Sequence, residues 1–355
     1  MSDEHAPAPE LRIDQLTGLR ALIVPGRRGR PDAFASQRPA TAAGEGERCP
    51  FCAGRETETP PEVWANRPDG GEPDGPGWLQ RAVPNLYPAL SAAGRTPLSV
   101  SESGLTSAAD PLLASARAAE PDLFGAVAAT GAHEVIVNAP RHVATLAELE
   151  PDELVGAVAA WRARIAAHAP EASLVHLFVN EGARAGATRE HSHAQLLALP
   201  FVPAQIARER ERFGAYNVRT AGSHLLEDVL VEEVRRRKRL VAIDAEAALI
   251  CPWASRWCYE LRLVPRSTAP RFEDDDRGAE LLGRGLRALA VVLGPGVGLN
   301  LWVRTAPRGS DEFCWHVDIA PRTTTAGAVE LGAGLDLNPL APEQAAAELR
   351  AAMAD

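Results

Sequence analysis

Residues 180–195 read NEGARAGATREHSHAQ, a glycine-spaced loop that runs into the pattern His-x-His-x-Gln. Successive side chains of a β-strand point to opposite faces, so His191, His193 and Gln195 share one face of the strand expected here. The residues LLALPFVP that follow fit a strand interior ending at Pro200. Buried polar groups need partners, so a core strand seldom carries three on one face. The pattern admits two interpretations: a satisfied polar cluster at a strand end, or a site that handles phosphate or metal.

The composition is that of a globular protein, with 355 residues, 46% hydrophobic and 24% charged, and a formal net charge of -10. This acidic balance argues against a nucleic-acid binder, and the basic run at 235–239 is explained by helix-surface ion pairs with Glu232 and Glu233. The N-terminus shows no secretion signal, and the longest apolar run, 286–303, is broken by glycine and proline, so no membrane span is expected. Five cysteines without such a signal predict reduced thiols and a cytoplasmic protein.

Two segments share one pattern, residues 133–200 and residues 259–322. Each reads as a strand, a turn with proline and arginine, a helix with an acidic start, a strand, a loop and a strand. The expected buried helix faces are Leu154, Val158, Trp161 and Ile165 in the first segment, and Leu282, Leu286, Leu289 and Leu293 in the second. An offset close to 123 residues aligns His193 with His316. We therefore expect an α+β fold made by tandem duplication, with antiparallel sheets and helices packed on them.

Cys49 and Cys52 form a Cys-x2-Cys pair in a loop. Two thiolates at this spacing can chelate one zinc ion in tetrahedral geometry. The redox alternative needs the motif at the start of a helix in a thioredoxin-like unit, and no such unit follows. The histidines available as further ligands are His133, His142, His168, His176 and His191. His142 follows the strand EVIVNAP and His191 opens the site strand, so a site made by these two histidines with Cys49 and Cys52 would pin the N-terminal loop to the first segment. His133 starts its strand and is expected to be a structural or surface residue. Four protein ligands leave no open position, so this zinc is expected to be structural.

Six motifs occur in order along the chain: CPFC, VPNLYPAL, HEVIVNAPRHVATL, NEGARAGATREHSHAQ, CWHVDIAPR and PEQAAAELR. Together they resemble the galactose-1-phosphate uridylyltransferase family of the histidine-triad superfamily, from about Leu16 to the end of the chain. The resemblance implies two tandem copies of the histidine-triad (HIT-like) fold. Residues 1–195 would carry the zinc and the reacting histidine, and residues 196–355 would be a degenerate copy.

The resemblance also implies roles for individual residues. The second histidine of the motif, His193, would become uridylylated, which needs a neutral imidazole with one ring nitrogen free. Gln195 would bind the nucleotidyl phosphate, and Arg27 and Arg30 would reach the site of a partner subunit, which implies a homodimer. The family's zinc ligands fall on Cys49, Cys52, His142 and His191, and its nucleotide and phosphate contacts on Asn85, Asn180, Gly182, Gly186 and Thr188.

The chain departs from the family at several positions. Some members hold a second metal with one glutamate and three histidines. Glu209 and His316 stand at two of those positions, but Arg304 and Cys314 replace two histidines, which argues against a second metal. This chain also has Ser192 where the family often has proline, and Leu86 where the family often has aspartate. It has Ala328 and Val329 where lysine and phenylalanine are expected.

Three functions compete. The favoured hypothesis is the exchange of UMP between UDP-glucose and a hexose 1-phosphate, galactose 1-phosphate, by ping-pong kinetics through a uridylyl-histidine. The second is a related enzyme, such as an ADP-sugar phosphorylase or a nucleotide hydrolase. Gln195 cannot cycle protons for water as a third histidine would, which favours transfer over hydrolysis. The third is a non-catalytic nucleotide-binding or zinc-stabilised scaffold, which His193, Gln195 and the glycine loop argue against. The base, uridine or adenine, and the hexose stay open.

Overall fold

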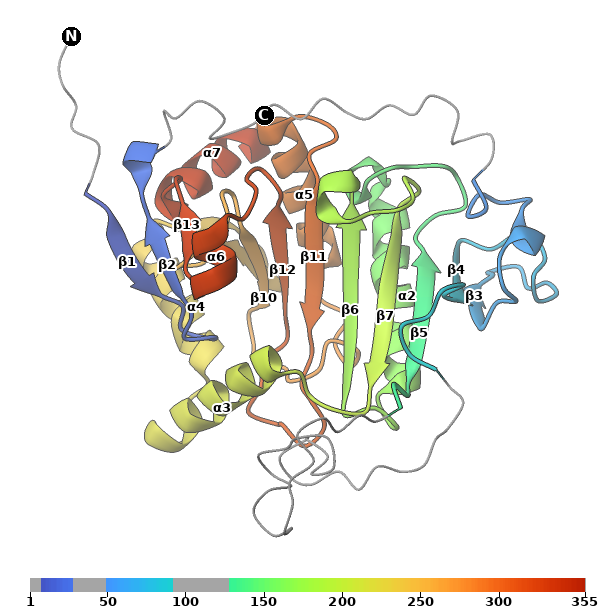
Figure 1. The fold of residues 1–355 in the computed structure, drawn as a ribbon, viewed down its shortest axis with the longest axis horizontal. Coiled ribbons are helices and arrows are strands. Elements are labelled where there is room, and N and C mark those ends of the chain that lie inside the picture. Colours follow the sequence, from blue (N-terminus) through green and yellow to red (C-terminus); the bar gives the residue numbers. More distant parts are fainter. Residues whose placement is uncertain (1–7, 28–48, 92–127, 355) are drawn as a thin grey trace.

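The computed structural model describes residues 8–27, 49–91 and 128–354 (Figure 1). Ten strands form one sheet: β3 (Trp64–Asn66), β4 (Gln80–Pro84), β5 (Ala132–Val137), β6 (Leu174–Glu181), β7 (His193–Leu199), β8 (Leu240–Ile243), β9 (Ala247–Ile250), β10 (Leu261–Pro265), β11 (Leu299–Arg304) and β12 (His316–Pro321). Their order across the sheet is β3-β4-β5-β7-β6-β11-β12-β10-β9-β8. Every neighbouring pair is antiparallel.

The two halves of this sheet have the same strand order. From one edge to the centre the order is β3-β4-β5-β7-β6, and from the other edge it is β8-β9-β10-β12-β11. We call β3–β7 with their helix the first copy, and β8–β12 with theirs the second copy. The expected duplicated α+β fold is confirmed, but the two copies share one continuous sheet rather than forming a sheet each. They join where β6 pairs with β11, so that Asn180 lies opposite Asn300. The division at residue 195 stays a proposal, and β7 continues past that residue.

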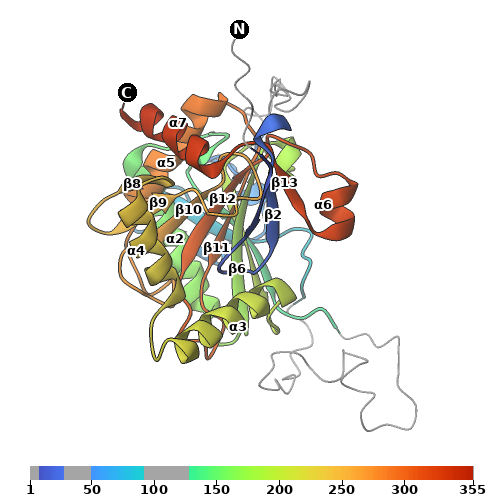
Figure 2. The same ribbon diagram turned by 90° about the vertical axis from the view of Figure 1, so that its left-hand side faces the viewer.

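One face of the sheet is covered by helices α2 (Pro151–His168) and α5 (Ala279–Leu293), with α7 (Pro342–Ala354) packed on α5. Helix α2 begins at a capping box, in which the Glu153 carboxylate accepts a hydrogen bond from the Glu150 backbone N–H at 2.9 Å, and proline occupies the first turn. The helix faces expected from the sequence point into the core, although Leu293 is only half-buried. Figure 2 shows α5 on the opposite side of the sheet from α6 (Ala328–Ala333).

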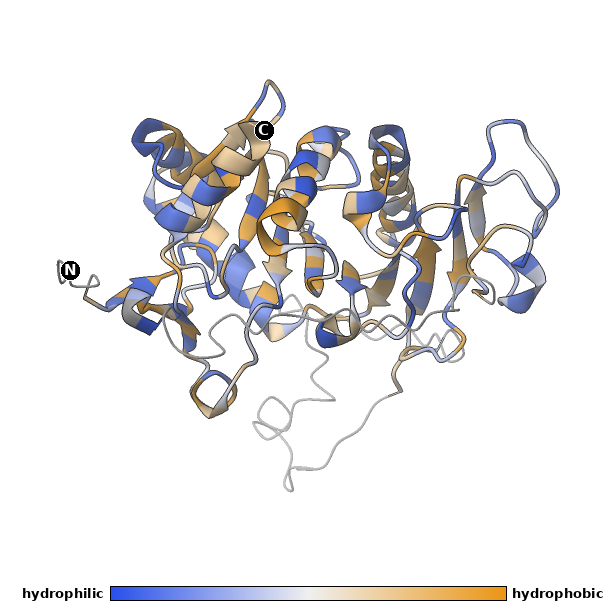
Figure 3. Ribbon diagram, turned by 90° about the horizontal axis from the view of Figure 1, so that it is seen from above, coloured by the Kyte–Doolittle hydropathy of each residue, from blue (hydrophilic) through white to orange (hydrophobic). Residues whose placement is uncertain are grey.

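The other face carries the polar residues, and we call it the site face. Opposed residues of antiparallel strands point to the same side. The register therefore places Val135, Gln195, Phe178, Trp302, Asp318 and Arg262 in one row across six strands on this face. The alternate residues Ala194 and Leu196 are fully buried under the helices. Figure 3 shows the apolar residues, in orange, along the strands and the helices that cover them.

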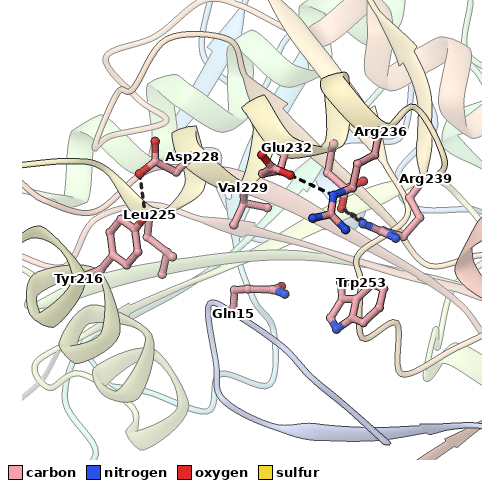
Figure 4. A pocket seen from close by; sticks show the side chains of 10 residues that line it. Gln15, Tyr216, Leu225, Asp228, Val229, Glu232, Arg236, Arg239 and Trp253 are labelled. Atoms are coloured by element: carbon pink, nitrogen blue, oxygen red, sulfur yellow. Dashed lines mark hydrogen bonds and ion pairs between the residues drawn. The ribbon is translucent and has the colours of Figure 1, made fainter. Parts of the chain in front are cut away.

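The remaining elements lie mainly around the second copy. A small sheet contains β1 (Glu10–Ile13), β2 (Arg20–Ile23) and β13 (Asp336–Asn338), in the order β1-β2-β13. Helices α3 (Ala204–Arg219) and α4 (Leu225–Arg236) flank a groove of about 360 Å³. There Tyr216 donates a hydrogen bond to Asp228, and Trp253 lies opposite them (Figure 4). Within the described ranges, no helix is both long and apolar enough to cross a bilayer.

Candidate active site and metal centre

The four predicted metal ligands come together at one end of the first copy. The ligand atoms of Cys49, Cys52, His142 and His191 all lie within 4.8 Å of one another. The sulfur of Cys49 is 3.4 Å from Nδ1 of His191, and the sulfur of Cys52 is 3.5 Å from Nδ1 of His142 and 3.6 Å from that of His191. Zinc–sulfur and zinc–nitrogen bonds at tetrahedral angles would separate sulfur from nitrogen by about 3.5 Å. The residues therefore fit a four-coordinate metal ion.

The surroundings prepare His191 to act as a ligand. Its Nε2–H donates to the carbonyl of Ala139 at 2.9 Å, which leaves the lone pair of Nδ1 facing the two thiols. Burial lowers the pKa of His191 to about 4, so the ring is neutral at neutral pH. Burial and the neighbouring Cys49 raise the pKa of the Cys52 thiol to about 11, which disfavours the thiolate. A bound cation would lower this pKa and favour the thiolate.

His193 opens β7, two residues after this ligand. Its Nδ1 lies 2.7 Å from the backbone carbonyl of His191. A carbonyl can only accept, so Nδ1 carries the proton and Nε2 keeps its lone pair. Burial lowers the pKa of His193, which favours the neutral ring. The ring of Phe51, from the Cys-x2-Cys loop, is centred 5.4 Å from that of His193. The metal loop thus also packs against the predicted nucleophile, a contact that the sequence analysis did not anticipate.

Gln195 lies on the same face and contacts His133, which the sequence indicated to be a structural or surface residue rather than part of the site. Nδ1 of His133 accepts a hydrogen bond from the backbone N–H of Ala89 at 3.0 Å. The ring proton is therefore on Nε2, which donates to Oε1 of Gln195 at 3.1 Å. Because this contact occupies the amide oxygen, the NH2 group of Gln195 remains as the donor for a ligand. Asn85 lies beside the pair, with Nδ2 3.1 Å from the same Nε2.

The glycine loop follows β6 and is open to solvent. Gly182 and Gly186 have φ values of 76° and 85°, a region that side chains other than glycine rarely adopt. Both glycines and Thr188 are exposed, whereas Asn180 at the end of β6 is half-buried. Backbone N–H groups of an exposed glycine loop can approach phosphate oxygens closely. The structure therefore places the predicted phosphate contacts in one loop next to the His193 strand.

Ser192, which stands where the family frequently has proline, anchors the back of the site strand. Its hydroxyl accepts a hydrogen bond from Nδ2 of Asn138 at 3.0 Å, and Trp161 of α2 donates to the other end of that amide at 2.9 Å. All three side chains are buried. This chain of hydrogen bonds ties β7 and β5 to the helix beneath them.

The second copy places an ion pair where a second metal was considered. Nε of Arg304 lies 3.1 Å from Oε2 of Glu209, and Nε2 of His316 lies 4.0 Å from the other oxygen of that carboxylate. Burial raises the pKa of Glu209 to about 7, and the Arg304 guanidinium opposes that rise. Among the described residues, the Cys49 group is the one cluster of three or more ligand side chains close enough for a metal. The guanidinium of Arg304 therefore places a positive charge next to the Glu209 carboxylate.

The two basic residues of the predicted inter-subunit contact are only partly visible. Arg27 ends a short 3-10 helix, η1 (Pro25–Arg27), directly after β2, and is half-buried. It belongs to the small three-stranded sheet and its turn rather than to the strands that carry His193. Arg30 lies outside the described residues.

The chain is similar to a group of known nucleotide-sugar enzymes. A family model described as galactose-1-phosphate uridyl transferase, N-terminal domain, matches residues 103–203. ADP-glucose phosphorylase from Arabidopsis thaliana is 28% identical over 97% of this chain and 93% of that protein. Galactose-1-phosphate uridylyltransferase from Cryptococcus neoformans is 28% identical over 72% of this chain and 62% of that protein.

A solved structure shares the whole architecture. The crystal structure of ADP-glucose phosphorylase from Arabidopsis thaliana with bound ADP-glucose superposes with a TM-score of 0.76 and 26% identity, covering 97% of this chain and 98% of that one. With its duplicated sheet, its Cys/His cluster and its His-x-His-x-Gln strand, this chain is similar to the galactose-1-phosphate uridylyltransferase family of the histidine-triad superfamily.

Proposed function

We propose that the protein is a nucleotidyltransferase that cleaves an ADP-sugar with phosphate, through a covalent intermediate on His193. The observation that carries the proposal is the hydrogen bond from Nδ1 of His193 to the His191 carbonyl, because it leaves Nε2 as a free lone pair. The near full-length similarity to an ADP-glucose phosphorylase favours adenine over uridine as the base.

The reaction has two displacements at the same phosphorus atom. In the first, Nε2 of His193 attacks the phosphorus next to the nucleoside, and the bond to the sugar phosphate breaks to release a sugar 1-phosphate. In the second, an oxygen of inorganic phosphate attacks the same phosphorus, the N–P bond breaks, and ADP leaves. The leaving groups are anions that need little protonation, so positioning and charge stabilisation carry most of the catalysis.

The other site residues have roles that follow from their geometry. The NH2 group of Gln195 donates to a phosphate oxygen, because His133 occupies its carbonyl oxygen. Asn85, Asn180 and Thr188, with the backbone of Gly182 and Gly186, surround the nucleotide and its phosphates. Zinc held by the Cys49 cluster would supply a structural cross-link between the N-terminal loop and β7, with no open coordination position.

The second candidate is the exchange of UMP between UDP-glucose and galactose 1-phosphate. It uses the same first displacement, but the acceptor is a hexose 1-phosphate. The observation in its favour is the similarity to galactose-1-phosphate uridylyltransferases, one of which matches over 72% of this chain. Taken together, the comparisons support the ADP-sugar reaction better.

One labelling experiment separates the two candidates. The purified protein is incubated, without acceptor, with ADP-glucose or UDP-glucose that is radiolabelled in the α-phosphate. We expect ADP-glucose to label the protein and to release at most one equivalent of glucose 1-phosphate per site. Inorganic phosphate should then discharge the label as ADP. Labelling by UDP-glucose alone, discharged by galactose 1-phosphate, would select the second candidate, and no labelling by either substrate would reject both.

We further propose a homodimer, in which the segment containing Arg27 and Arg30 reaches the partner's phosphates. The support is the resemblance of this basic segment to the family's inter-subunit arm. Sedimentation should give twice the chain mass of 37.8 kDa. A fully active monomer would exclude a shared site.

A further inference from the structure

The two copies join where β6 pairs with β11, and this junction contains a pair of asparagines. Asn300 of β11 lies directly opposite Asn180 of β6. Its Nδ2 is 2.7 Å from Oδ1 of Asn180 and 2.8 Å from the backbone carbonyl of Ala185, inside the glycine loop. One side chain of the second copy therefore reaches two points of the first copy's predicted phosphate site.

The chemistry of these contacts fixes which way both amides face. The carbonyl of Ala185 can only accept, so the atom of Asn300 that faces it must be the nitrogen. That nitrogen has two hydrogens, and the second points to Asn180, which must therefore present its oxygen. The NH2 group of Asn180 is then turned towards the loop, where a Cβ built on Gly186 would lie 3.9 Å from it. Asn180 consequently offers two N–H donors beside the exposed backbone of the loop.

The backbone around Asn300 also packs closely on the loop. A Cβ added to Gly182 would lie 3.2 Å from the Cα of Gly298, and one added to Gly298 would lie 3.3 Å from the backbone nitrogen of Ala185. Both distances are shorter than ordinary contacts, so neither position has room for a larger residue without a shift. The start of β11 thus fixes the loop on one side, and Asn300 adds the polar attachment.

We propose that Asn300, from the copy without the reacting histidine, is a positioning residue for nucleotidyl transfer. It holds the amide of Asn180 with its N–H groups towards the phosphate oxygens, and it restrains the loop through the carbonyl of Ala185. This inference rests on the proposed function. A misplacement of about 1 Å in a positioned group can slow a reaction about a hundredfold, so a small change at Asn300 has a measurable effect.

The first test replaces Asn300 by aspartate. Asn300→Asp keeps the shape of the side chain but turns two donated hydrogen bonds into repulsion between oxygens. We expect the first-order rate of protein labelling at saturating nucleotide-sugar to fall about 10- to 100-fold, with a much smaller change in the concentration that gives half the maximal rate. The matched control is Asn66→Asp on β3, which removes a donor to Gln80 at 2.8 Å in the same sheet. The control should label within about twofold of the wild type, and labelling of Asn300→Asp at the wild-type rate would overturn the proposal.

The second test asks whether Asn300 acts through Asn180. In a double-mutant cycle, Asn300→Asp is combined with Asn180→Ala. If the two residues work as a unit, the double variant should label within about threefold of the slower single variant. Effects that multiply in full would overturn the part of the proposal in which Asn300 holds the amide of Asn180, and the loop contact at Ala185 is tested separately below.

The third test needs no substrate. Hydrogen exchange is followed in a peptide that covers residues 181–187, where the N–H of Ala185 bonds to the Gly182 carbonyl at 3.0 Å and that of Ala187 bonds to the same carbonyl at 3.2 Å. Asn300→Asp should speed exchange in this peptide, whereas Asn66→Asp should not. Unchanged exchange in Asn300→Asp would overturn the restraint of the loop. A wild-type protein that no nucleotide-sugar labels would instead reject the proposed function, so the two failures are distinguishable.

Discussion

In the first copy, Nδ1 of His193 lies 2.7 Å from the carbonyl two residues earlier, and in the second copy Nδ1 of His316 lies 3.0 Å from the corresponding carbonyl of Cys314. The backbone thus orients both imidazoles alike. Their surroundings differ, because Nε2 of His316 is buried 3.7 Å from an Asp318 carboxylate oxygen and 4.0 Å from one of Glu209. The fold therefore supplies the orientation of a histidine, and the neighbouring side chains decide whether it can reach a substrate.

The largest expected effect comes from changing both histidines in the same way. The amide nitrogen of asparagine can replace Nδ1 in the hydrogen bond to the preceding carbonyl, but asparagine has no atom in place of Nε2. His193→Asn should slow protein labelling by about a thousandfold or more, since it removes the proposed nucleophile. His316→Asn should label within about threefold of the wild type under conditions where the variant stays folded. A loss of equal size in both variants would show that the copies are not chemically distinct.

The next effect compares Cys49, a predicted metal ligand of the first copy, with Cys314, which stands in the second copy where the first has the ligand His191. Cys49→Ser should lower the free energy of unfolding by about 3 kcal/mol or more when metal is present, because the loop loses its attachment to β7. Cys314→Ser, which changes a buried thiol outside any ligand cluster, should cost about 1 kcal/mol. Urea unfolding with parallel metal analysis measures both. Equal losses, or wild-type protein purified without chelator and free of zinc, would contradict a metal site in the first copy.

A smaller effect should appear as a pH dependence at the end of β6, where the first copy has Glu181 and the second copy has Thr305. Burial raises the pKa of Glu181 to about 8, helped by the nearby Glu148 and opposed by the backbone N–H of Leu146. The unfolded chain ionises from about pH 4.5, so this group's contribution to stability is complete below that pH and is lost as the pH rises to about 8.

Glu181→Gln cannot ionise and keeps an acceptor for Leu146. The variant should therefore gain stability over the wild type as the pH rises from 5 to 8, by about 1 kcal/mol or more. Urea unfolding at the two pH values gives the difference. Glu72→Gln, at an exposed carboxylate that is not among the groups acting on Glu181, is the control and should show little such trend. A Glu181→Gln difference that is flat with pH would refute the buried, protonated carboxyl.

The smallest expected effect concerns the partners of Gln195 and its counterpart Asp318. Gln195 accepts from the Nε2–H of His133, whereas Asp318 accepts from the guanidinium of Arg262 at 2.6 Å. His133→Phe should slow labelling about tenfold, because the Gln195 amide is no longer held. His133→Gln, which restores a donor, should recover part of the rate. Equal rates in the two variants would mean that His133 only fills space.

Most of the fold and the ligand cluster could be predicted from the sequence, because the signals are local. Period-3.6 apolar positions mark α2 and α5, and the pattern His-x-His-x-Gln marks one face of β7. His142 follows β5 and His191 precedes β7, the neighbouring strand, so these two ligands lie close together, and the Cys-x2-Cys spacing supplies the other two as a pair.

The missed features depend on contacts between distant segments. His133 contacts Gln195 because of the register between β5 and β7, and Asn300 contacts Asn180 because β11 pairs with β6. His133 opens the motif HEVIVNAPRHVATL but nothing in that motif indicates its partner, and Asn300 lies in none of the motifs. No local pattern encodes which strands become neighbours. The joining of two copies into one sheet was missed for the same reason.

The pairing of β6 with β11 also has a consequence for the newly made chain. Asn180 and Asn300 are 120 residues apart, and a ribosome adds about 5 to 20 residues per second, so β6 waits roughly 6 to 24 seconds for its partner strand. During that time the first copy has an open edge strand, and edge strands pair readily with other chains. Rapid synthesis or chaperones that cover this edge should raise the yield of native protein, and a polypeptide that stops before β11 should aggregate or pair with itself along β6.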